Sequence, residues 1–424
     1  EKGEIVKLPR KSMLLIAIVF VLLGVAGGSI VPRDVKAESL SQNAPLHWVP
    51  CEGAPATPAR ECTAINVPLD YADPAKGTTQ LQLARIKARN PDPVTHRGTL
   101  FFVPGGPPSA GVNYVGYTAN IDRWISPDIQ AVYDIVGIQQ LGSWDGTPCI
   151  NGEAVTRYWD ANHLPKTPEQ LHTIMGLEKE YNDGCVRSEN TLVPYMNTAR
   201  SIRDMDTVRQ SLAADKVSLF SYSYGTALAH GYVSKYPSHV KRAVLDSVVD
   251  RSLPDPIQST ENIVEWEKAW QRFKDWCQSG TACVLKGQNI DQAFDTALTT
   301  ARTTGIPAPR NPFGNRPVND WQFLITLQAL TGAGEATRLW AATLLQDAAN
   351  GDGSQAGFMY DLLTGRRPDG TNIGGDGTRR AYSCNDTIWS QLFKKPEDVK
   401  TWVQATELVA PRFGAVGVYQ GVAQ

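Results

Sequence analysis

The stretch V-S-L-F-S-Y-S-Y-G-T, residues 217–226, carries the clearest structural signal in the chain. An apolar run leads into a tight turn centred on Ser223, and the small or helix-forming residues Ala227, Leu228 and Ala229 follow. This layout is typical of a nucleophile elbow, in which a strained turn between a strand and a helix holds a serine hydroxyl above a parallel sheet. We therefore predict that Ser223 is a catalytic nucleophile.

The segments around this turn alternate between helical and strand patterns. Ser201–Leu212 has apolar residues at helical spacing, and Arg242–Val249 is a further apolar strand. Four β-rich runs come earlier in the chain: Ala64–Leu69, Gln80–Ala88, Thr99–Val103 and Ala131–Ile138. The alternation predicts an α/β fold with a mostly parallel sheet that is covered on both faces.

Beyond Asp250 the strand signals stop and helical patterns dominate. Three segments are predicted to be helices: Glu261–Cys277, Trp321–Leu330 and Ala336–Ala349. We interpret the Trp-rich face of the first as part of a hydrophobic core. Gly351–Gly377 is predicted to be a long loop. We divide the chain into a leader (1–37), the N-terminal part of the sheet core (38–250), a helical cap (251–386) and the start of a return to the core (387–424).

The N-terminus has the pattern of an export signal. Basic residues precede a nearly unbroken apolar run, Met13–Val31, and Ala37 suits cleavage by a signal peptidase. The run has a length between that of a signal peptide and that of a short membrane span, so it is either a cleaved leader or a retained anchor. The sequence predicts a secreted or cell-envelope protein.

Composition excludes several classes of partner. The 424 residues include 41 Lys and Arg against 43 Asp and Glu, and the formal net charge of -2 argues against nucleic acid as a ligand. No C-x-x-C motif or histidine cluster indicates zinc, and no motif indicates a cofactor. We predict neither a metal nor a cofactor.

Seven cysteines in an exported chain suggest disulfides. Three pairs are close in sequence: Cys51 with Cys62, Cys149 with Cys185, and Cys277 with Cys283. Cys384 remains, either as a thiol, as a cross-link between chains, or as half of another pair.

Six strings, in order, resemble a known family. They are E-C-T-A-I-N-V-P-L-D-Y-A-D-P (61–74), P-G-G-P (104–107), N-T-A-R-S-I-R-D-M-D-T-V-R (197–209), S-Y-S-Y-G-T (221–226), L-D-S-V-V-D (245–250) and A-Y-S-C-N-D (381–386). The chain is similar, from about Trp48 to its end, to secreted tripeptidyl-aminopeptidase-type α/β hydrolases, relatives of proline iminopeptidase. The resemblance implies a peptide substrate, an acyl-enzyme on Ser223, and an oxyanion hole formed by the backbone of Tyr224 and Gly106.

The chain departs from the pattern of this family at three places. Ser221 stands where glycine is usual, so a Cβ has to fit against the elbow. Pro108 follows the glycine turn and has no N–H to donate. Gln139–Gly142 reads Q-Q-L-G where relatives resemble D-P-R-G, so an acid and a base are lost together; we interpret this as structural drift.

The chain offers a nucleophile without a recognisable base. In this fold the order is serine, acid, histidine, yet His47, His96, His163 and His172 precede Ser223. His230 lies about two helical turns after the serine, roughly 10 Å away, and His239 precedes the next strand at the opposite end of the sheet. Asp246 and Asp250 are conceivable acids.

We expect the triad Asp and His to lie beyond Gln424 in a longer gene product, with Cys384 pairing there. The polypeptide as given would then be an inactive fragment with an unpaired sheet edge.

Three functions are compatible with these observations. The first is a serine exopeptidase that releases tripeptides from free N-termini, with Glu261, Glu265 and Glu267 of the cap as candidates to bind the substrate amine. The second is an esterase or lipase, because an elbow does not distinguish amide from ester chemistry. The third is a non-catalytic binding protein on a hydrolase scaffold.

Overall fold

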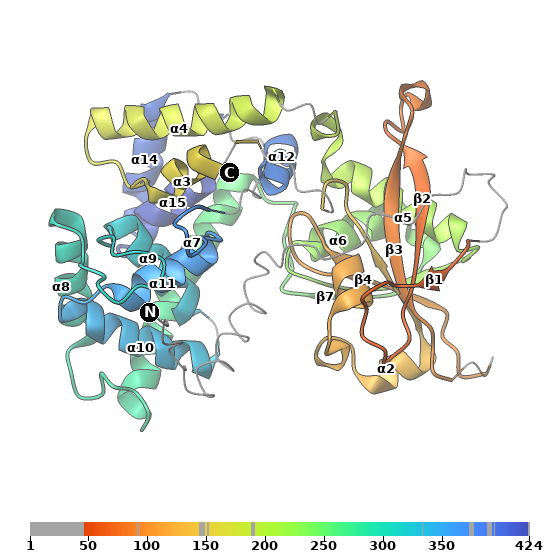
Figure 1. Cartoon of the computed structure of the whole chain (residues 1–424), viewed down its shortest axis with the longest axis horizontal. Helices are drawn as coiled ribbons and strands as arrows, with labels where there is room; N and C mark the ends of the chain where they lie inside the picture. The colour runs from red at the N-terminus through yellow and green to blue at the C-terminus, as the bar shows by residue number, and fades with distance from the viewer. Residues whose placement is uncertain are drawn as a thin grey trace, which may run out of the picture.

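The computed structural model describes residues 46–422, apart from 91, 93, 144–148, 151, 188–190, 333, 373–376, 388–391 and 394. The chain forms a sheet lobe and a helical lobe that lie side by side (Figure 1). The predicted leader, residues 1–37, lies outside the described residues. Within the described part of the chain, no helix is both long and apolar enough to cross a membrane.

The sheet lobe is built on seven strands in the order β1-β2-β3-β5-β4-β6-β7. Their bounds are β1 Val49–Pro50, β2 Glu61–Pro68, β3 Thr78–Ile86, β4 Thr99–Val103, β5 Asp134–Ile138, β6 Val217–Tyr222 and β7 Val240–Asp246. The pairs β1-β2, β2-β3 and β3-β5 are antiparallel, whereas the pairs β5-β4, β4-β6 and β6-β7 are parallel. The predicted α/β fold is confirmed, and the parallel half of the sheet carries the elbow.

Alternation along β6 explains the two cores of this lobe. Val217 and Leu219 pack with residues of α5 (Thr198–Ser211) and α6 (Gly225–Lys235). Phe220 and Tyr222 point to the other face, which is covered by the segment 112–133, including α2 (Pro127–Val132). Successive side chains of a strand alternate between faces, so one short strand contributes to both cores.

Strand β7 forms the edge of the sheet among the described residues. Its residues 241–244 are exposed, and 58% of the Val244 surface is open. Lys241 and Arg242 place charged side chains on this edge, which disfavours pairing with another strand.

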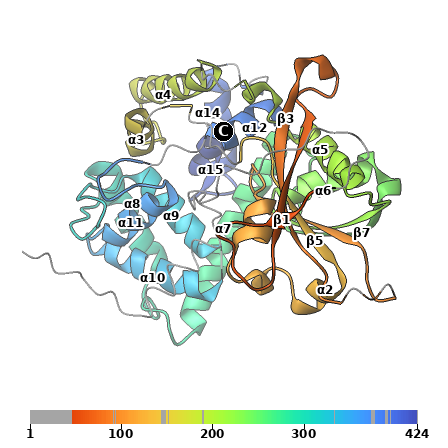
Figure 2. The ribbon, with the colours of Figure 1, turned by 45° about the vertical axis from the view of Figure 1, so that its right-hand side comes forward.

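The helical lobe surrounds a second large core (Figure 2). Its helices after the sheet are α7 Asp255–Ser279, α8 Ile290–Thr303, α9 Asp320–Thr331, α10 Glu335–Ala349 and α11 Ser354–Leu363. Trp270 and Phe273 of α7 are buried in this core, so the interpretation of the Trp-rich face as packing is confirmed.

The helical lobe draws on more of the chain than residues 251–386. Helices α3 (Gly152–Asp160) and α4 (Pro168–Arg187) precede the elbow in sequence, and Tyr360 of α11 donates a hydrogen bond to the carbonyl of Trp159 at 2.9 Å. Helices α14 (Pro396–Glu407) and α15 (Gly414–Val422) lie in the stretch expected to begin a return to the sheet core.

Helix α15 instead packs on α7. A Cβ added to Gly417 would lie 2.3 Å from Ile263, so the two helix backbones approach closely at this point.

The prediction of one long loop over Gly351–Gly377 is wrong for Ser354–Leu363, which is α11. The glycines hide the helix in the sequence, but Ala356, Met359 and Tyr360 are buried on one face of it. Gly357 is needed there because a Cβ would lie 2.9 Å from the Asn311 amide. Tertiary packing therefore overrides the weak helix propensity of this segment.

Helix α12 (Gly377–Asp386) connects the two lobes. Its Arg380 donates a hydrogen bond to Glu178 of α4 at 2.6 Å, and Tyr382 packs with Leu141 and Met196 of the sheet lobe.

The three predicted disulfides are confirmed: Cys51–Cys62, Cys149–Cys185 and Cys277–Cys283. Cys51 follows β1 and is joined to Cys62 in β2. Cys149 precedes α3 and is joined to Cys185 in α4. Cys277, in α7, is joined to Cys283 in the turn that follows this helix.

Candidate active site

Ser223 occupies the turn between β6 and α6, as the elbow pattern predicts. Its φ is 53°, in the left-handed region that residues with a side chain rarely adopt. The strain is held by hydrogen bonds on both sides of the residue. Its N–H donates to the carbonyl of Asp246 at 3.0 Å, and its own carbonyl accepts from the Thr226 N–H at 2.9 Å and the Thr226 hydroxyl at 2.6 Å. The Ser223 side chain is exposed, as a nucleophile must be.

Two glycines allow the backbone to crowd this serine. A Cβ on Gly105 would lie 3.0 Å from the Ser223 Cβ and 3.2 Å from its Oγ, so the glycine turn lies against the hydroxyl. A Cβ on Gly225 would lie 2.0 Å from the Val103 carbonyl, so α6 can start only beside the end of β4 if this position is glycine.

Two segments near Ser223 contain backbone N–H groups that could act as donors. Tyr224 is the N-cap residue of α6, and no acceptor within the described residues takes its N–H. In the turn 104–109 the three prolines have no N–H, and the Ser109 N–H donates to the Gln140 side chain. Gly105 and Gly106 are left as the residues of this turn whose N–H groups have no acceptor in the described part of the protein.

The residues that depart from the family pattern are accommodated. Ser221 is fully buried, and its hydroxyl donates to the Val244 carbonyl of β7 at 3.3 Å, so its Cβ fits beside the elbow. Gln139 accepts a hydrogen bond from the Gln82 N–H at 3.2 Å, and Gln140 binds the Ser109 N–H. Both glutamines therefore have hydrogen-bond partners in the structure.

Among the described residues, the six histidines make no hydrogen bond to Ser223. His239 is hydrogen bonded to Asp206 at 2.9 Å. Burial alone would raise the pKa of Asp206, but hydrogen bonds from Arg209, Tyr232 and His239 bring it to about 2.

Of the other five histidines, His230 lies on α6, the helix that follows Ser223. His163 is buried and bonded to the Tyr158 carbonyl at 2.9 Å, and His96 lies 3.4 Å from Asp134. His47, His172 and His230 are exposed. Among the described residues, no hydrogen bond joins the Ser223 hydroxyl to a side chain.

The acidic candidates make other contacts. Asp246 contributes its carbonyl to Ser223, while its carboxylate accepts from the Ser247 hydroxyl at 3.2 Å. Asp250 accepts from the Ser252 N–H and hydroxyl at 2.9 and 2.6 Å.

Of the three cap glutamates, two are already paired. Glu267 accepts from the Arg412 guanidinium at 2.8 Å and Glu265 from Lys268 at 2.7 Å. The exposed Glu261 has no ion pair among the described residues.

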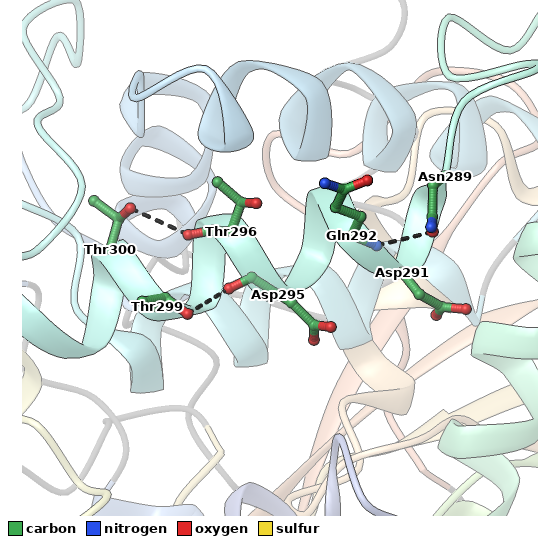
Figure 3. Close-up of a pocket in the computed structure, with 7 residues that line it drawn as sticks. All are labelled: Asn289, Asp291, Gln292, Asp295, Thr296, Thr299 and Thr300. Atoms are coloured by element: carbon green, nitrogen blue, oxygen red, sulfur yellow. Dashed lines mark hydrogen bonds between the residues drawn. The ribbon is translucent and has the colours of Figure 1, made fainter.

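A hollow of about 550 Å³ lies on α8, in the helical lobe (Figure 3). Its lining is Asn289, Asp291, Gln292, Asp295, Thr296, Thr299 and Thr300, all from this helix and its N-cap. Asp291 already binds Lys274 and Arg412 at 2.7 Å each, so the hollow is a polar surface of one helix and no part of the elbow. The described residues contain no group of side chains that could hold a metal ion.

Comparisons with known proteins agree with this geometry. The family model described as "alpha/beta hydrolase fold" matches residues 98–280, which include the glycine turn and the elbow. A tripeptidyl aminopeptidase of Streptomyces lividans is 25% identical over 386 residues, covering 86% of this chain and 67% of that protein. The serine protease Hip1 of Mycobacterium tuberculosis is 24% identical, covering 88% of this chain and 72% of that protein.

Carboxylesterase B of Mycobacterium tuberculosis is 27% identical, covering 85% of this chain and 68% of that protein. The chain spans about two thirds of the length of the tripeptidyl aminopeptidases that it matches.

Proposed function

Because the chain is an α/β hydrolase of the tripeptidyl-aminopeptidase type, we propose that it is an exported serine exopeptidase that releases tripeptides from free N-termini. Similarity to named tripeptidyl aminopeptidases and to a serine protease supports this proposal. The observation that carries it is the exposed Ser223 at a φ of 53°, beside two backbone N–H groups without acceptors in the described residues.

The proposed reaction is acyl transfer in two steps. The Ser223 oxygen attacks the carbonyl carbon of the scissile peptide bond while a base takes the hydroxyl proton. The C–N bond then breaks, and the amine leaves with that proton. Water attacks the resulting ester, returns a proton to Ser223 through the same base, and releases the peptide acid. The base would be an imidazole, as in other serine hydrolases of this mechanism.

The oxyanion of the tetrahedral intermediate would be bound by the N–H groups of Tyr224 and Gly106. Tyr224 stands at the N-terminus of α6, where unpaired N–H groups and the helix dipole favour negative charge. Gly106 would supply the second donor, because Ser109 is occupied by Gln140 and the neighbouring prolines have none. Donors arranged before the reaction stabilise the transition state without reorganising during it.

The helical lobe would restrict cleavage to chain ends, and Glu261 is the candidate for binding the substrate α-amine because the other two glutamates are paired. The test compares turnover of a chromogenic tripeptide with turnover of its N-acetylated form. We expect acetylation to abolish turnover. Equal turnover of the two substrates would exclude recognition of the amine.

An esterase is the second candidate, favoured by the similarity to carboxylesterase B. Hydrolysis of short-chain esters without cleavage of the tripeptide would establish it. A non-catalytic binding protein is the third candidate, suggested by Ser221 and Pro108; the Ser221 hydroxyl has a partner in β7, and Pro108 has no N–H to donate. Covalent labelling of Ser223 by a fluorophosphonate would exclude it.

Export is supported by the three disulfides, which form in oxidising compartments. Mass spectrometry of the mature N-terminus distinguishes cleavage after Ala37 from a retained anchor.

A further inference from the structure

A chain of hydrogen bonds joins Asp386, Thr198, the Tyr224 hydroxyl and Gln140, next to the elbow. The Thr198 hydroxyl donates to the Asp386 carboxylate at 2.6 Å and lies 2.6 Å from the Tyr224 hydroxyl. The Gln140 amide nitrogen donates to the Tyr224 hydroxyl at 3.5 Å and to Ser201 at 3.0 Å. The Gln140 oxygen accepts from the Ser109 N–H.

The carboxylate of Asp386, at one end of this chain of hydrogen bonds, can only accept, and this decides which group donates at each link. A hydroxyl has one proton, so Thr198, which donates to Asp386, must accept from Tyr224. Tyr224 can donate because burial raises the pKa of its phenol to about 12. Gln140 then donates to the Tyr224 oxygen, and each group in the chain is satisfied.

This chain joins the two sides of the proposed oxyanion hole. Tyr224 supplies one backbone donor, and Ser109 ends the turn that holds the other donor, Gly106. The Gln140 side chain is hydrogen bonded to the Tyr224 hydroxyl and to the Ser109 N–H. One side-chain amide therefore links the two sides of the proposed oxyanion hole. Neither Gln140 nor Thr198 contacts Ser223, so any effect on the reaction is transmitted through Tyr224 and the glycine turn.

The chain of hydrogen bonds ends at Asp386 on α12, and this helix also contacts the helical lobe. Asp386 accepts from the Thr198 N–H at 2.9 Å as well, and its backbone carbonyl accepts from Arg251 at 3.0 Å. Tyr382 of α12 lies 3.3 Å from the Ser201 hydroxyl, at the Gln140 end. Helix α12 thus reaches the chain at two points.

We propose that Gln140, Thr198 and Asp386 are positioning residues that hold Tyr224 and the turn 104–109 at the spacing needed to bind an oxyanion. Through Asp386 this spacing depends on α12, so the helical lobe contributes to the chemistry as well as to substrate access. The inference rests on the proposed function, because it concerns the donors of the same reaction.

The test uses paired variants that differ in one hydroxyl. Thr198→Val keeps the shape and removes the hydroxyl, whereas Thr198→Ser keeps the hydroxyl. Tyr224→Phe removes the phenol oxygen and keeps the backbone N–H. Its matched control is Tyr232→Phe, on the same helix, which removes a buried hydroxyl bonded to Asp206 at 2.9 Å. The measurement is the second-order rate of Ser223 labelling by a fluorophosphonate, with kcat and KM for a tripeptide substrate.

We expect Thr198→Val and Tyr224→Phe to lower the labelling rate and kcat by about tenfold or more with KM unchanged, since misplaced catalytic groups lose rate steeply. Thr198→Ser should restore the rate, and Tyr232→Phe should stay within about twofold of the original. If Thr198→Val does not fold, the Tyr224 and Tyr232 pair decides.

Equal rates for Thr198→Val and Thr198→Ser, or for Tyr224→Phe and Tyr232→Phe, would overturn the inference and leave the proposed function standing. Absence of labelling in the unchanged protein would overturn both.

Discussion

Adding one methyl group at Gly105 should inactivate Ser223 without unfolding the protein. In Gly105→Ala the new Cβ would lie 3.0 Å from the Ser223 Cβ and 3.2 Å from its Oγ, so one side has to move by a few tenths of an ångström. Ser223 cannot yield freely, because its N–H and carbonyl are both held by hydrogen bonds. The methyl also occupies space beside the hydroxyl that a substrate carbonyl needs.

The size of the effect follows from the geometry. A misplacement of about 1 Å at a reacting group can cost about 100-fold in rate. A smaller shift combined with lost substrate space predicts a loss of about 10- to 100-fold, equivalent to about 1.4–2.8 kcal/mol of activation free energy. The assay is the rate of fluorophosphonate labelling at Ser223, measured beside a thermal melt that should change by only a few degrees.

Two other glycines calibrate this result. Gly176→Ala lies on the exposed face of α4 with no atom within 4 Å, so it should keep the labelling rate and gain up to about 1 kcal/mol of stability. Gly225→Ala would place a methyl 2.0 Å from the Val103 carbonyl and should disrupt folding. A Gly105→Ala protein that labels as fast as Gly176→Ala would refute the placement of the glycine turn against the nucleophile.

Three further predictions concern the remaining structure. Asp361→Ala should cost about 3 kcal/mol of unfolding free energy by denaturant titration, at the low end of the range for breaking a buried pair, because Arg316 and Arg366 both lose this carboxylate and are left to share Asp160; exposed Glu265→Ala should cost under about 1 kcal/mol. Asp206 has a folded pKa of about 2, below its unfolded value of about 3.9, so its stabilising contribution is complete above the unfolded value and is lost as pH falls towards 2. Asp206→Asn should reduce the fall in melting temperature that occurs as the pH is lowered towards 2. If the variant shows the same fall as the original protein, other groups cause the loss of stability at low pH. Ser221→Ala should lower the free energy of unfolding by about 0.5–1.5 kcal/mol, because the hydrogen bond to β7 is lost, and should leave the rate of Ser223 labelling unchanged. A faster labelling rate would mean that the Ser221 hydroxyl obstructs the elbow.

The sequence predicted those features that depend on neighbouring residues. The elbow at Ser223 was predictable because the apolar run, the turn and the small helical residues are contiguous, and the strand Thr99–Val103 has the predicted bounds. The three disulfides were predictable because their cysteines are near one another in sequence.

Features that depend on distant contacts could not be predicted in this way. Helix α11 is stabilised by burial against other helices, which glycine-rich sequence does not indicate. Asp386 and Thr198 are 188 residues apart, and no local pattern connects them. The contact of Gln140 with the Tyr224 hydroxyl and the Ser109 N–H joins segments that are distant in the sequence, and no local pattern indicates it.

The most direct measurement is the mass of the complete protein after reaction with a fluorophosphonate, followed by mapping of the modified peptide. The account predicts one adduct, located on Ser223, that is absent from Ser223→Ala. An unmodified protein, or an adduct on any other residue, would contradict the assignment of Ser223 as the nucleophile.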